Sequence, residues 1–235
     1  MASRLKARAT KDVKPGRIKG ILAGGPGSGK TWHALSFPSA YYIDTEGGAD
    51  LAQYQERLKA SGGIYFGRAE GSMDPAAVID EIQVLATERH PYKTLVIDSY
   101  SKLHGTIIGM EQERLGKKDA FGASKKPAIA WGRRLMTWLD RGDMNVWLVC
   151  HEQALWEGSG DDRKEVGKTA DIWEKFMYEL HLSLHIKALG KGIREAEVKK
   201  SRLEGFPLFD RFYLEKNGED VGYREFTARY SKSRI

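Results

Sequence analysis

The sequence predicts an α/β fold with a mostly parallel central sheet, flanked by helices and extended by antiparallel strands near the C-terminus. Short runs such as TLVID (94–98) and NVWLVC (145–150) are continuously apolar, as expected of strands buried on both faces. Helix-compatible segments separate these runs, which indicates a parallel α/β core. In contrast, LHLSLHIKAL (180–189) alternates apolar and polar residues, which is typical of antiparallel strands.

The first half of the chain should supply the leading strands and the helices between them. Strands are predicted at 17–25, 40–44 and 94–98, with a minor strand between turns at 62–67. A short helix should follow the glycines after the first strand and stop at Pro38, because proline breaks a helix. Asp74 suits a helix cap and Pro75 suits the first turn, so a helix should run from there to about residue 85. Further helices are predicted at 49–60 and 100–115.

The second half changes in texture after the strand at 145–150. Loops are predicted at 114–127, which is basic and contains glycine, and at 157–168, which is polar. A helix is predicted at 128–141 and strands at 180–189 and 193–202. Asn217-Gly218 indicates a tight turn between strand-like flanks. We expect one domain over 17–235 that ends in this β-hairpin extension.

Composition limits the class of protein. The sequence of 235 residues is 41% hydrophobic and 30% charged, as in soluble globular proteins. No apolar stretch approaches the roughly 20 residues that span a bilayer, and no signal peptide opens the chain. Cys150 is the single cysteine, so no intramolecular disulfide can form. We expect a cytoplasmic protein with no membrane partner.

The positive charge is concentrated at the N-terminus. The formal net charge is +6, while residues 1–19 hold one acidic residue, Asp12, and the basic residues Arg4, Lys6, Arg8, Lys11, Lys14, Arg17 and Lys19. We interpret residues 1–16 as a flexible basic arm that contacts a polyanion, with nucleic acid as the leading candidate. The alternative is a solvated tail that only aids solubility.

The stretch GGPGSGKT (24–31) matches the phosphate-binding pattern G-x-x-x-x-G-K-(S/T) between a predicted strand and a predicted helix. Its glycines let backbone N–H groups surround phosphate oxygens, and the helix N-terminus adds positive potential. Lys30 would reach the β- and γ-phosphates, and the Thr31 hydroxyl would ligate Mg²⁺. The predicted binding residues are Gly24, Gly25, Pro26, Gly27, Ser28, Gly29, Lys30, Thr31 and Trp32. A purely structural glycine turn is the alternative.

Acidic residues follow two predicted strands. Asp98 ends TLVID, where a P-loop enzyme needs a carboxylate for the Mg²⁺ shell, and Ser99 is able to hydrogen-bond beside it. Alternatively, Asp98 only caps the helix at 100–115. YYIDTEGG (41–48) presents two further acids, Asp44 and Glu46. We expect a structural role for Asp44.

The order GGPGSGKT, YYIDTEGG, TLVIDSY, VWLVCHE resembles the motif order of RecA-like P-loop ATPases. The resemblance implies a RecA-like NTPase core that uses ATP and Mg²⁺, with the strand at 145–150 between the P-loop and Asp98 strands. It makes Glu46 the candidate base that polarises water, Asp98 the metal acid, and His151 the γ-phosphate sensor. His151 departs from the amide usual at that position. A solvated turn acid at Glu46 and a histidine that only completes a strand end at 151 remain alternatives.

Lys200 and Arg202 in EVKKSR (197–202) lie on the same face of a predicted strand. They resemble the K-x-R pair that RecA and hexameric helicases insert into a neighbouring subunit's ATP site. There they would stabilise charge during phosphoryl transfer. A basic edge strand that deters aggregation is the alternative.

The resemblance covers about residues 17–215 and is strongest to small RecA-like ATPases of bacteriophages, including the "Sak four" single-strand annealing proteins. It implies a homo-oligomer, as a ring or filament, with ATP at subunit interfaces, in the bacterial host cytoplasm. It also implies DNA contacts from loops 114–127 and 153–170. The candidate contacts are Lys117, Lys118, Lys125, Lys126, Trp156, Arg163, Lys164 and Lys168, each of which could instead be a solvated surface residue.

We therefore expect a Mg²⁺-dependent, DNA-stimulated ATPase that binds single-stranded DNA and promotes annealing or strand exchange in phage recombination. A single-stranded DNA-binding protein is a further expected partner. The alternatives are a helicase or helicase-loader motor on the same core, a nucleotide kinase, and a regulator that hydrolyses little ATP. A kinase would need an arginine-bearing lid, and Arg163 is the one arginine of the 157–168 loop.

Overall fold

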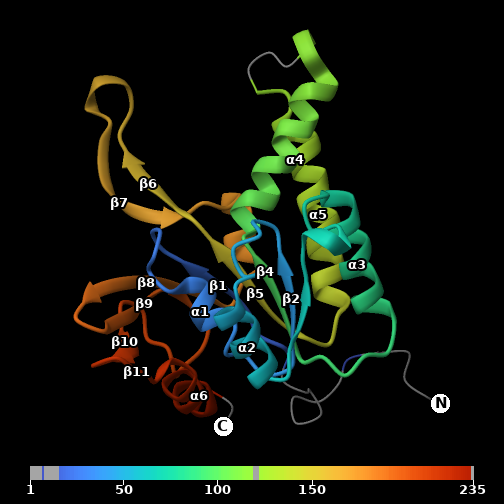
Figure 1. The fold of residues 1–235 in the computed structure, drawn as a ribbon. Coiled ribbons are helices and arrows are strands. Elements are labelled where there is room, and N and C mark those ends of the chain that lie inside the picture. Colours follow the sequence, from blue (N-terminus) through green and yellow to red (C-terminus); the bar gives the residue numbers. More distant parts are fainter. Residues whose placement is uncertain (1–6, 8–15, 119–121, 234–235) are drawn as a thin grey trace, which may run out of the picture.

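The computed structural model describes residues 7, 16–118 and 122–233, and it is built around a nine-stranded sheet (Figure 1). The strand order is β11-β10-β9-β8-β1-β5-β4-β2-β3. Pairing is parallel from β3 through β8 and antiparallel from β8 to β11. These strands are β1 (Lys19–Ala23), β2 (Ala40–Asp44), β3 (Ile64–Phe66), β4 (Thr94–Asp98), β5 (Asn145–Cys150), β8 (Leu182–Gly190), β9 (Ile193–Ser201), β10 (Arg211–Lys216) and β11 (Glu219–Asp220). The predicted α/β fold class is confirmed.

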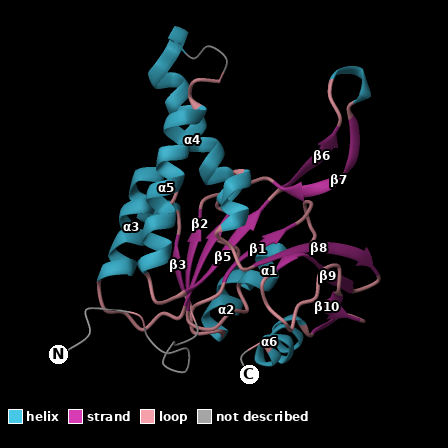
Figure 2. Cartoon of the chain, turned by 180° about the vertical axis from the view of Figure 1, so that it is seen from behind, coloured by secondary structure: helices cyan, strands magenta, loops and turns pink. Residues whose placement is uncertain are grey.

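Helices cover both faces of the sheet (Figure 2). They are α1 (Lys30–Ala34), α2 (Ala52–Ala60), α3 (Pro75–Thr87), α4 (Tyr100–Leu115), α5 (Lys125–Arg141) and α6 (Gly222–Lys232). Alternate residues of each strand point to opposite faces. Thus Ile97 and Leu148 pack in a core with α3, α4 and α5, whereas Val96 and Trp147 pack in a second core with α1, α2 and α6. Burial on both faces explains why the central strands are continuously apolar.

Strand β5 lies between β1 and β4, as the sequence resemblance implied. The registers pair Ala23 with Cys150 and Val149 with Asp98, so all three strands end at the same edge of the sheet. The residues that follow these strands therefore meet at one place. This edge carries the phosphate-binding loop, the acidic residues and His151.

The polar segment after β5 differs from the prediction. A loop was expected at 157–168, but the structure has a two-stranded antiparallel hairpin of β6 (Glu152–Glu157) and β7 (Lys164–Ala170). A short 3-10 turn (Gly160–Asp162) joins the two strands. The hairpin and the end of α4 project beyond the same end of the sheet in Figure 1. The two strands satisfy each other's backbone N–H and C=O groups, so the hairpin forms without an apolar sequence pattern.

Two other predictions need correction. The loop expected at 114–127 is shorter, because α4 continues to Leu115 and α5 begins at Lys125. Residues after the Asn217-Gly218 turn were expected to be strand-like, but only Glu219–Asp220 pairs before helix α6 begins. Phe226 and Tyr230 are four residues apart and stack at 5.9 Å, so they share one helix face.

The expected arm at 1–16 lies almost entirely outside the described residues, as do 119–121 within the expected loop. In the part of the chain that the structure describes, no helix is long and apolar enough to cross a membrane.

Candidate nucleotide-binding site

The phosphate-binding loop connects β1 to α1. Lys30 donates from Nζ to the carbonyl oxygens of Gly24 and Gly25, at 2.8 and 2.9 Å. Gly29 has φ +100°, a conformation that favours glycine. A Cβ at Gly24 would lie 2.4 Å from the Ile186 carbonyl oxygen, so the neighbouring β8 backbone leaves no room for a side chain. These contacts explain the glycines through close backbone approach.

Asp98 ends β4 directly beside this loop. Its Oδ2 accepts a 2.6 Å hydrogen bond from Thr31 Oγ1 and another from the hydroxyl of Tyr42 on β2. Burial raises the pKa of the Asp98 carboxyl to about 6, although both hydroxyl donors act to lower it. Asp98 and Thr31 therefore place two side-chain oxygen atoms next to each other. Tyr42 was not predicted as a site residue, because within its apolar strand it has no feature that distinguishes it from a core tyrosine.

Glu46 belongs to a second polar cluster. Its Oε1 lies 2.6 Å from the donating hydroxyl of Ser99 and 2.7 Å from Nε2 of His151. Ser99 also accepts from the backbone N–H of Lys102, so Ser99, and not Asp98, is the N-cap of α4. Ser99 was expected to bond beside Asp98, but its hydroxyl donates to Glu46. The cluster fixes the Glu46 carboxylate between the ends of β4 and β5.

Asp44 holds the loop that carries Glu46. Its Oδ1 accepts from the backbone N–H groups of Glu46 and Gly47, at 3.0 and 2.7 Å, and its Oδ2 accepts from Ala49 N at 2.8 Å. The Tyr65 hydroxyl adds a 2.8 Å bond to Oδ2. Such backbone contacts to a buried carboxylate shape the turn and orient the residue two positions later. The two acids of YYIDTEGG thus have different surroundings.

One cavity of about 470 Å³ brings the predicted residues together. It is lined by Gly24, Pro26, Gly27, Lys30, Thr31, Glu46, Asp98, His151 and Glu152. Burial lowers the pKa of Lys30, and the nearby acids Asp98, Glu46 and Glu152 oppose that effect. Glu152 in turn contacts His185 Nε2 at 2.9 Å. The cavity offers a cation, oxygen ligands and a fixed carboxylate within one enclosure.

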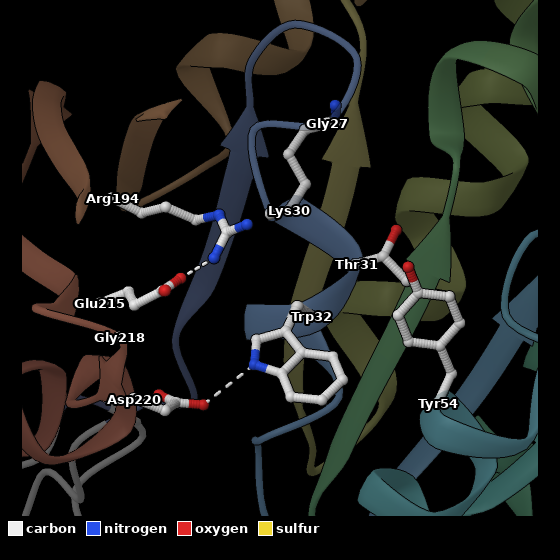
Figure 3. Close-up of a pocket in the computed structure, with 10 residues that line it drawn as sticks. Gly27, Lys30, Thr31, Trp32, Tyr54, Arg194, Glu215, Gly218 and Asp220 are labelled. Carbon is white, nitrogen blue, oxygen red and sulfur yellow. Dashed lines mark hydrogen bonds and ion pairs between the residues drawn. The ribbon is translucent and has the colours of Figure 1, made fainter. Parts of the chain in front are cut away.

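A second cavity, of about 560 Å³, adjoins the same loop and shares Gly27, Lys30 and Thr31 with the first (Figure 3). It is lined by Gly27, Gly29, Lys30, Thr31, Trp32, Tyr54, Arg194, Glu215, Gly218 and Asp220. Trp32 donates to Asp220 at 3.2 Å, and the Arg57 guanidinium lies 4.3 Å from the Trp32 ring centre. Arg194, Glu215 and Asp220 were not predicted, because their strands are far from the glycine motif in sequence.

Lys200 and Arg202 do not approach this site. Lys200 pairs in register with Ser183 on β8, which pairs with Ile21 in the middle of β1. Arg202 N donates to His181 O, and His181 N donates to Lys19 O at the amino end of β1, whereas the phosphate-binding loop follows the carboxyl end. The Lys200 ammonium donates to the carbonyl oxygens of Met177 and Leu180. Arg202 donates to a neighbouring carbonyl oxygen, that of Tyr178. Neither side chain can serve the ATP site of its own subunit from this position.

The expected DNA contacts fall on two projecting regions. Lys125 and Lys126 lie in the first turn of α5, and Lys118 lies in a 3-10 turn after α4. On the hairpin, Trp156 is 47% exposed and the Arg163 guanidinium lies 4.9 Å from its ring centre. Hairpin acids accompany these cations, since Lys168 pairs with Glu165 at 2.9 Å.

Residues 17–190 match the family described as "AAA domain", which is most of the chain. The chain belongs to the AAA-domain family. No curated protein is significantly similar to it. A solved structure, the RadB recombinase, is similar with TM-score 0.53 and 20% identity over 83% of this chain and 86% of that one. At that identity the likeness establishes a RecA-like fold.

This member of the AAA-domain family therefore has the architecture of a RecA-like P-loop ATPase. Such ATPases use a Mg²⁺–nucleotide complex, so the side-chain oxygens of the cavity are compared with the ligands that Mg²⁺ requires. Among the described residues, no cluster of three or more His, Cys, Asp and Glu side chains could hold a metal. Mg²⁺ needs fewer protein ligands when nucleotide phosphates complete its shell. Thr31 and Asp98 supply neighbouring oxygens of that kind. The residues fit a Mg²⁺–nucleotide complex.

Proposed function

We propose that this protein hydrolyses ATP, binds single-stranded DNA and promotes annealing or strand exchange in phage homologous recombination. The observation that carries the ATPase proposal is the shared cavity of Lys30, Asp98 and Glu46. It combines phosphate binding, a metal carboxylate and a separate carboxylate for water. A site built only to bind nucleotide would not need the third group.

In the proposed mechanism the chain's residues divide the work. Lys30 and the loop N–H groups bind the phosphates, and Thr31 with Asp98 would hold Mg²⁺. Bound Mg²⁺ neutralises charge on the phosphate oxygens. Glu46 orients the attacking water and accepts its proton, because Ser99 and His151 hold its carboxylate in place. His151, through Nε2, links Glu46 to the end of β5, which supports a role in sensing the terminal phosphate.

We propose that Lys200 and Arg202 act on the ATP site of a neighbouring subunit in a homo-oligomer. Their contacts with the Met177, Leu180 and Tyr178 carbonyls, away from the cavity of their own subunit, support this. Burial and the adjacent Arg202 charge lower the pKa of Lys200. A polyanionic phosphate from another subunit would relieve the repulsion between the two cations.

The DNA proposal rests on the projecting hairpin and on the charge of the N-terminal residues. The hairpin presents Trp156 and Arg163 as an exposed aromatic and cation pair, suited to a base and a phosphate. Basic residues 1–16 could add a sequence-independent phosphate contact. We further propose that residues 17–235 form the functional unit, in the host cytoplasm, and that a single-stranded DNA-binding protein is a partner.

ATP hydrolysis with and without single-stranded DNA tests the proposal. Wild type should hydrolyse ATP faster with DNA, and Glu46→Gln should lower kcat by about 10²-fold or more while ATP still binds. Exposed Glu204→Gln, on a turn, serves as the matched control. Equal rates in Glu46→Gln and wild type would reject Glu46 as the base. Phosphate transfer to a nucleoside would identify a kinase, and ATP-driven duplex unwinding a helicase motor.

A further inference from the structure

Arg194 reaches the phosphate-binding loop from β9, outside the 17–190 region of the family match. Its side chain crosses directly over Gly29: a Cβ at Gly29 would lie 2.7 Å from Arg194 Cδ and 3.0 Å from Nε. The guanidinium points into the cavity shared with Gly27 and Lys30 (Figure 3). The absence of a side chain at position 29 therefore makes room for Arg194 at the loop.

The Arg194 guanidinium has one ion-pair partner, and at least one of its N–H donors has no partner among the described residues. Arg194 forms an ion pair through Nη1 with Glu215 of β10. Its Nε is buried and has no hydrogen-bond partner among the described residues. Guanidinium groups carry five N–H donors in a planar fork that matches phosphate oxygens. The Arg194 side chain is 36% exposed and lines the cavity, so N–H groups of the fork that do not pair with Glu215 can donate to phosphate oxygens there.

The position of the two cavities indicates which part of a nucleotide Arg194 would meet. Glu46 and Asp98 line the cavity on one side of Lys30, where the reacting terminal phosphate belongs under the proposed function. Trp32, Tyr54 and Arg194 line the second cavity, which shares Lys30 with the first. The remainder of the nucleotide must extend into that second cavity. Arg194 then faces the phosphates that ATP and ADP share.

We propose that Arg194 binds the inner phosphates of the nucleotide within its own subunit, and that Glu215 positions its guanidinium. The proposal rests on the proposed ATP site and adds a residue to it. Arg194 and Arg202 lie on the same C-terminal part of the chain but at opposite edges of the sheet. The first acts within the subunit, so the loss of Arg194 should weaken nucleotide binding even in an isolated subunit.

Equilibrium binding of ATP and ADP, each with Mg²⁺, tests this by calorimetry. Arg194→Ala should raise both Kd values by about tenfold or more and by the same factor, since charged hydrogen bonds to shared phosphates are lost. Arg194→Lys keeps the charge without the fork and should give an intermediate loss. Arg211→Ala is the matched control: Arg211 on β10 contacts Glu195 and Glu197, at 3.4 and 3.6 Å, and is exposed. Its Kd values should stay within about twofold of wild type.

The outcomes separate the two proposals. If wild type binds neither nucleotide, the proposed ATP site fails. If wild type binds and Arg194→Ala binds ATP and ADP equally well, only the Arg194 assignment is overturned. A loss confined to ATP would also overturn it, because Arg194 would then contact the terminal phosphate. Urea unfolding should show a native transition in each variant, and if Arg194→Ala does not fold, Arg194→Lys decides by the same comparison.

Discussion

The ionised Asp98 carboxylate lowers the stability of the folded protein, in addition to its proposed role in binding Mg²⁺. Burial raises the pKa of its carboxyl from 3.8 to about 6, so the folded protein holds this proton more tightly than the unfolded chain. Stability from this group therefore falls as pH rises from about 4 to 6 and stays reduced above that. A carboxylate placed for a divalent cation is unfavourable until the cation binds. Such local instability is common at functional sites.

Asp98→Asn should therefore stabilise the protein while abolishing its activity. The pKa difference corresponds to about 3 kcal/mol at most in the free energy of unfolding at pH 7.5. Urea unfolding without added metal or nucleotide measures the gain, and an assay of Mg²⁺-dependent ATP hydrolysis measures the loss. Asp162→Asn, on the exposed hairpin turn, should change neither quantity. A destabilised Asp98→Asn protein would contradict the electrostatic account.

His33 on α1 should give the opposite pH dependence. Burial lowers its pKa to about 4, and the nearby Arg57 also lowers it while Asp220 opposes. The unfolded histidine binds a proton below about pH 6.5, whereas the folded one does not until about pH 4. Stability from this group is therefore present at pH 7 and is lost as pH falls.

The Asp98→Asn background isolates this effect, because the Asp98 carboxyl acts in an overlapping pH range with opposite sign. There, adding His33→Leu should flatten the fall in unfolding free energy between pH 7 and pH 4 by up to about 3 kcal/mol. Urea unfolding at several pH values provides the measurement. Parallel pH curves with and without His33 would show that the histidine contributes nothing.

At the scale of elements, helix α6 is joined to the core by aromatic packing. Phe226 contacts Trp147 at 5.4 Å, Phe206 at 5.2 Å and Phe37 at 5.5 Å between ring centres. Phe37 also stacks on Trp147 at 4.7 Å. These rings come from α6, β5, the chain before β10 and the segment after α1. The C-terminal helix thus closes the core face that also carries α1 and the phosphate-binding loop.

Truncating the central ring should be costly. Phe226→Ala is expected to lower the free energy of unfolding by about 3–5 kcal/mol, because a 4% exposed phenyl ring is replaced by a cavity. Tyr223→Ala, on the same helix but 36% exposed, should cost clearly less. Urea unfolding compares the two. Similar losses for both variants would show that α6 is not part of the core. That result would also contradict the proposal that residues 17–235 form one unit.

At the scale of the whole molecule, the sheet separates two sets of charged groups. The cavity with Lys30 and Glu46 lies at the carboxyl edge of the parallel strands, while Lys200 and Arg202 lie toward the opposite edge. The nine-stranded sheet keeps them apart in one subunit. Head-to-tail assembly would bring the second set of one subunit to the first set of the next.

Mixed oligomers test that arrangement. Lys30→Ala and Arg202→Ala should each be nearly inactive, the first for lack of phosphate binding and the second for lack of the donated cation. A mixture should recover ATPase activity, because an intact Lys30 site can face an intact Arg202 from the other subunit. Activity no greater than the sum of the separate variants, under conditions where subunits exchange, would reject action between subunits. A mixture of Lys30→Ala with Glu46→Gln, both defective in the same site, is the control that should not recover.

The local signals in the sequence predicted the core well. Continuous apolar runs marked β4 and β5, and the glycine-rich motif marked the phosphate-binding loop, because burial on both faces and close backbone approach each restrict residue type locally. The order of motifs also placed β5 between its neighbours correctly. The hairpin at 152–170 was missed because backbone hydrogen bonds between its own two strands stabilise it, and its polar sequence gave no strand pattern. Helix α6 was missed because its aromatic contacts involve partners elsewhere in the chain.

The sequence by itself determined the α/β class, the phosphate-binding loop and the acidic ends of two strands, since each depends on neighbouring residues. Only the tertiary structure decided that Ser99 and His151 hold Glu46, that Tyr42 contacts Asp98, and that Arg194 crosses Gly29. Those contacts depend on strand order and register, which join residues distant in the chain. The physical reason is that strand order and register decide which side chains meet at the edge of a sheet, whereas sequence spacing predicts contacts only between residues that are close along the chain.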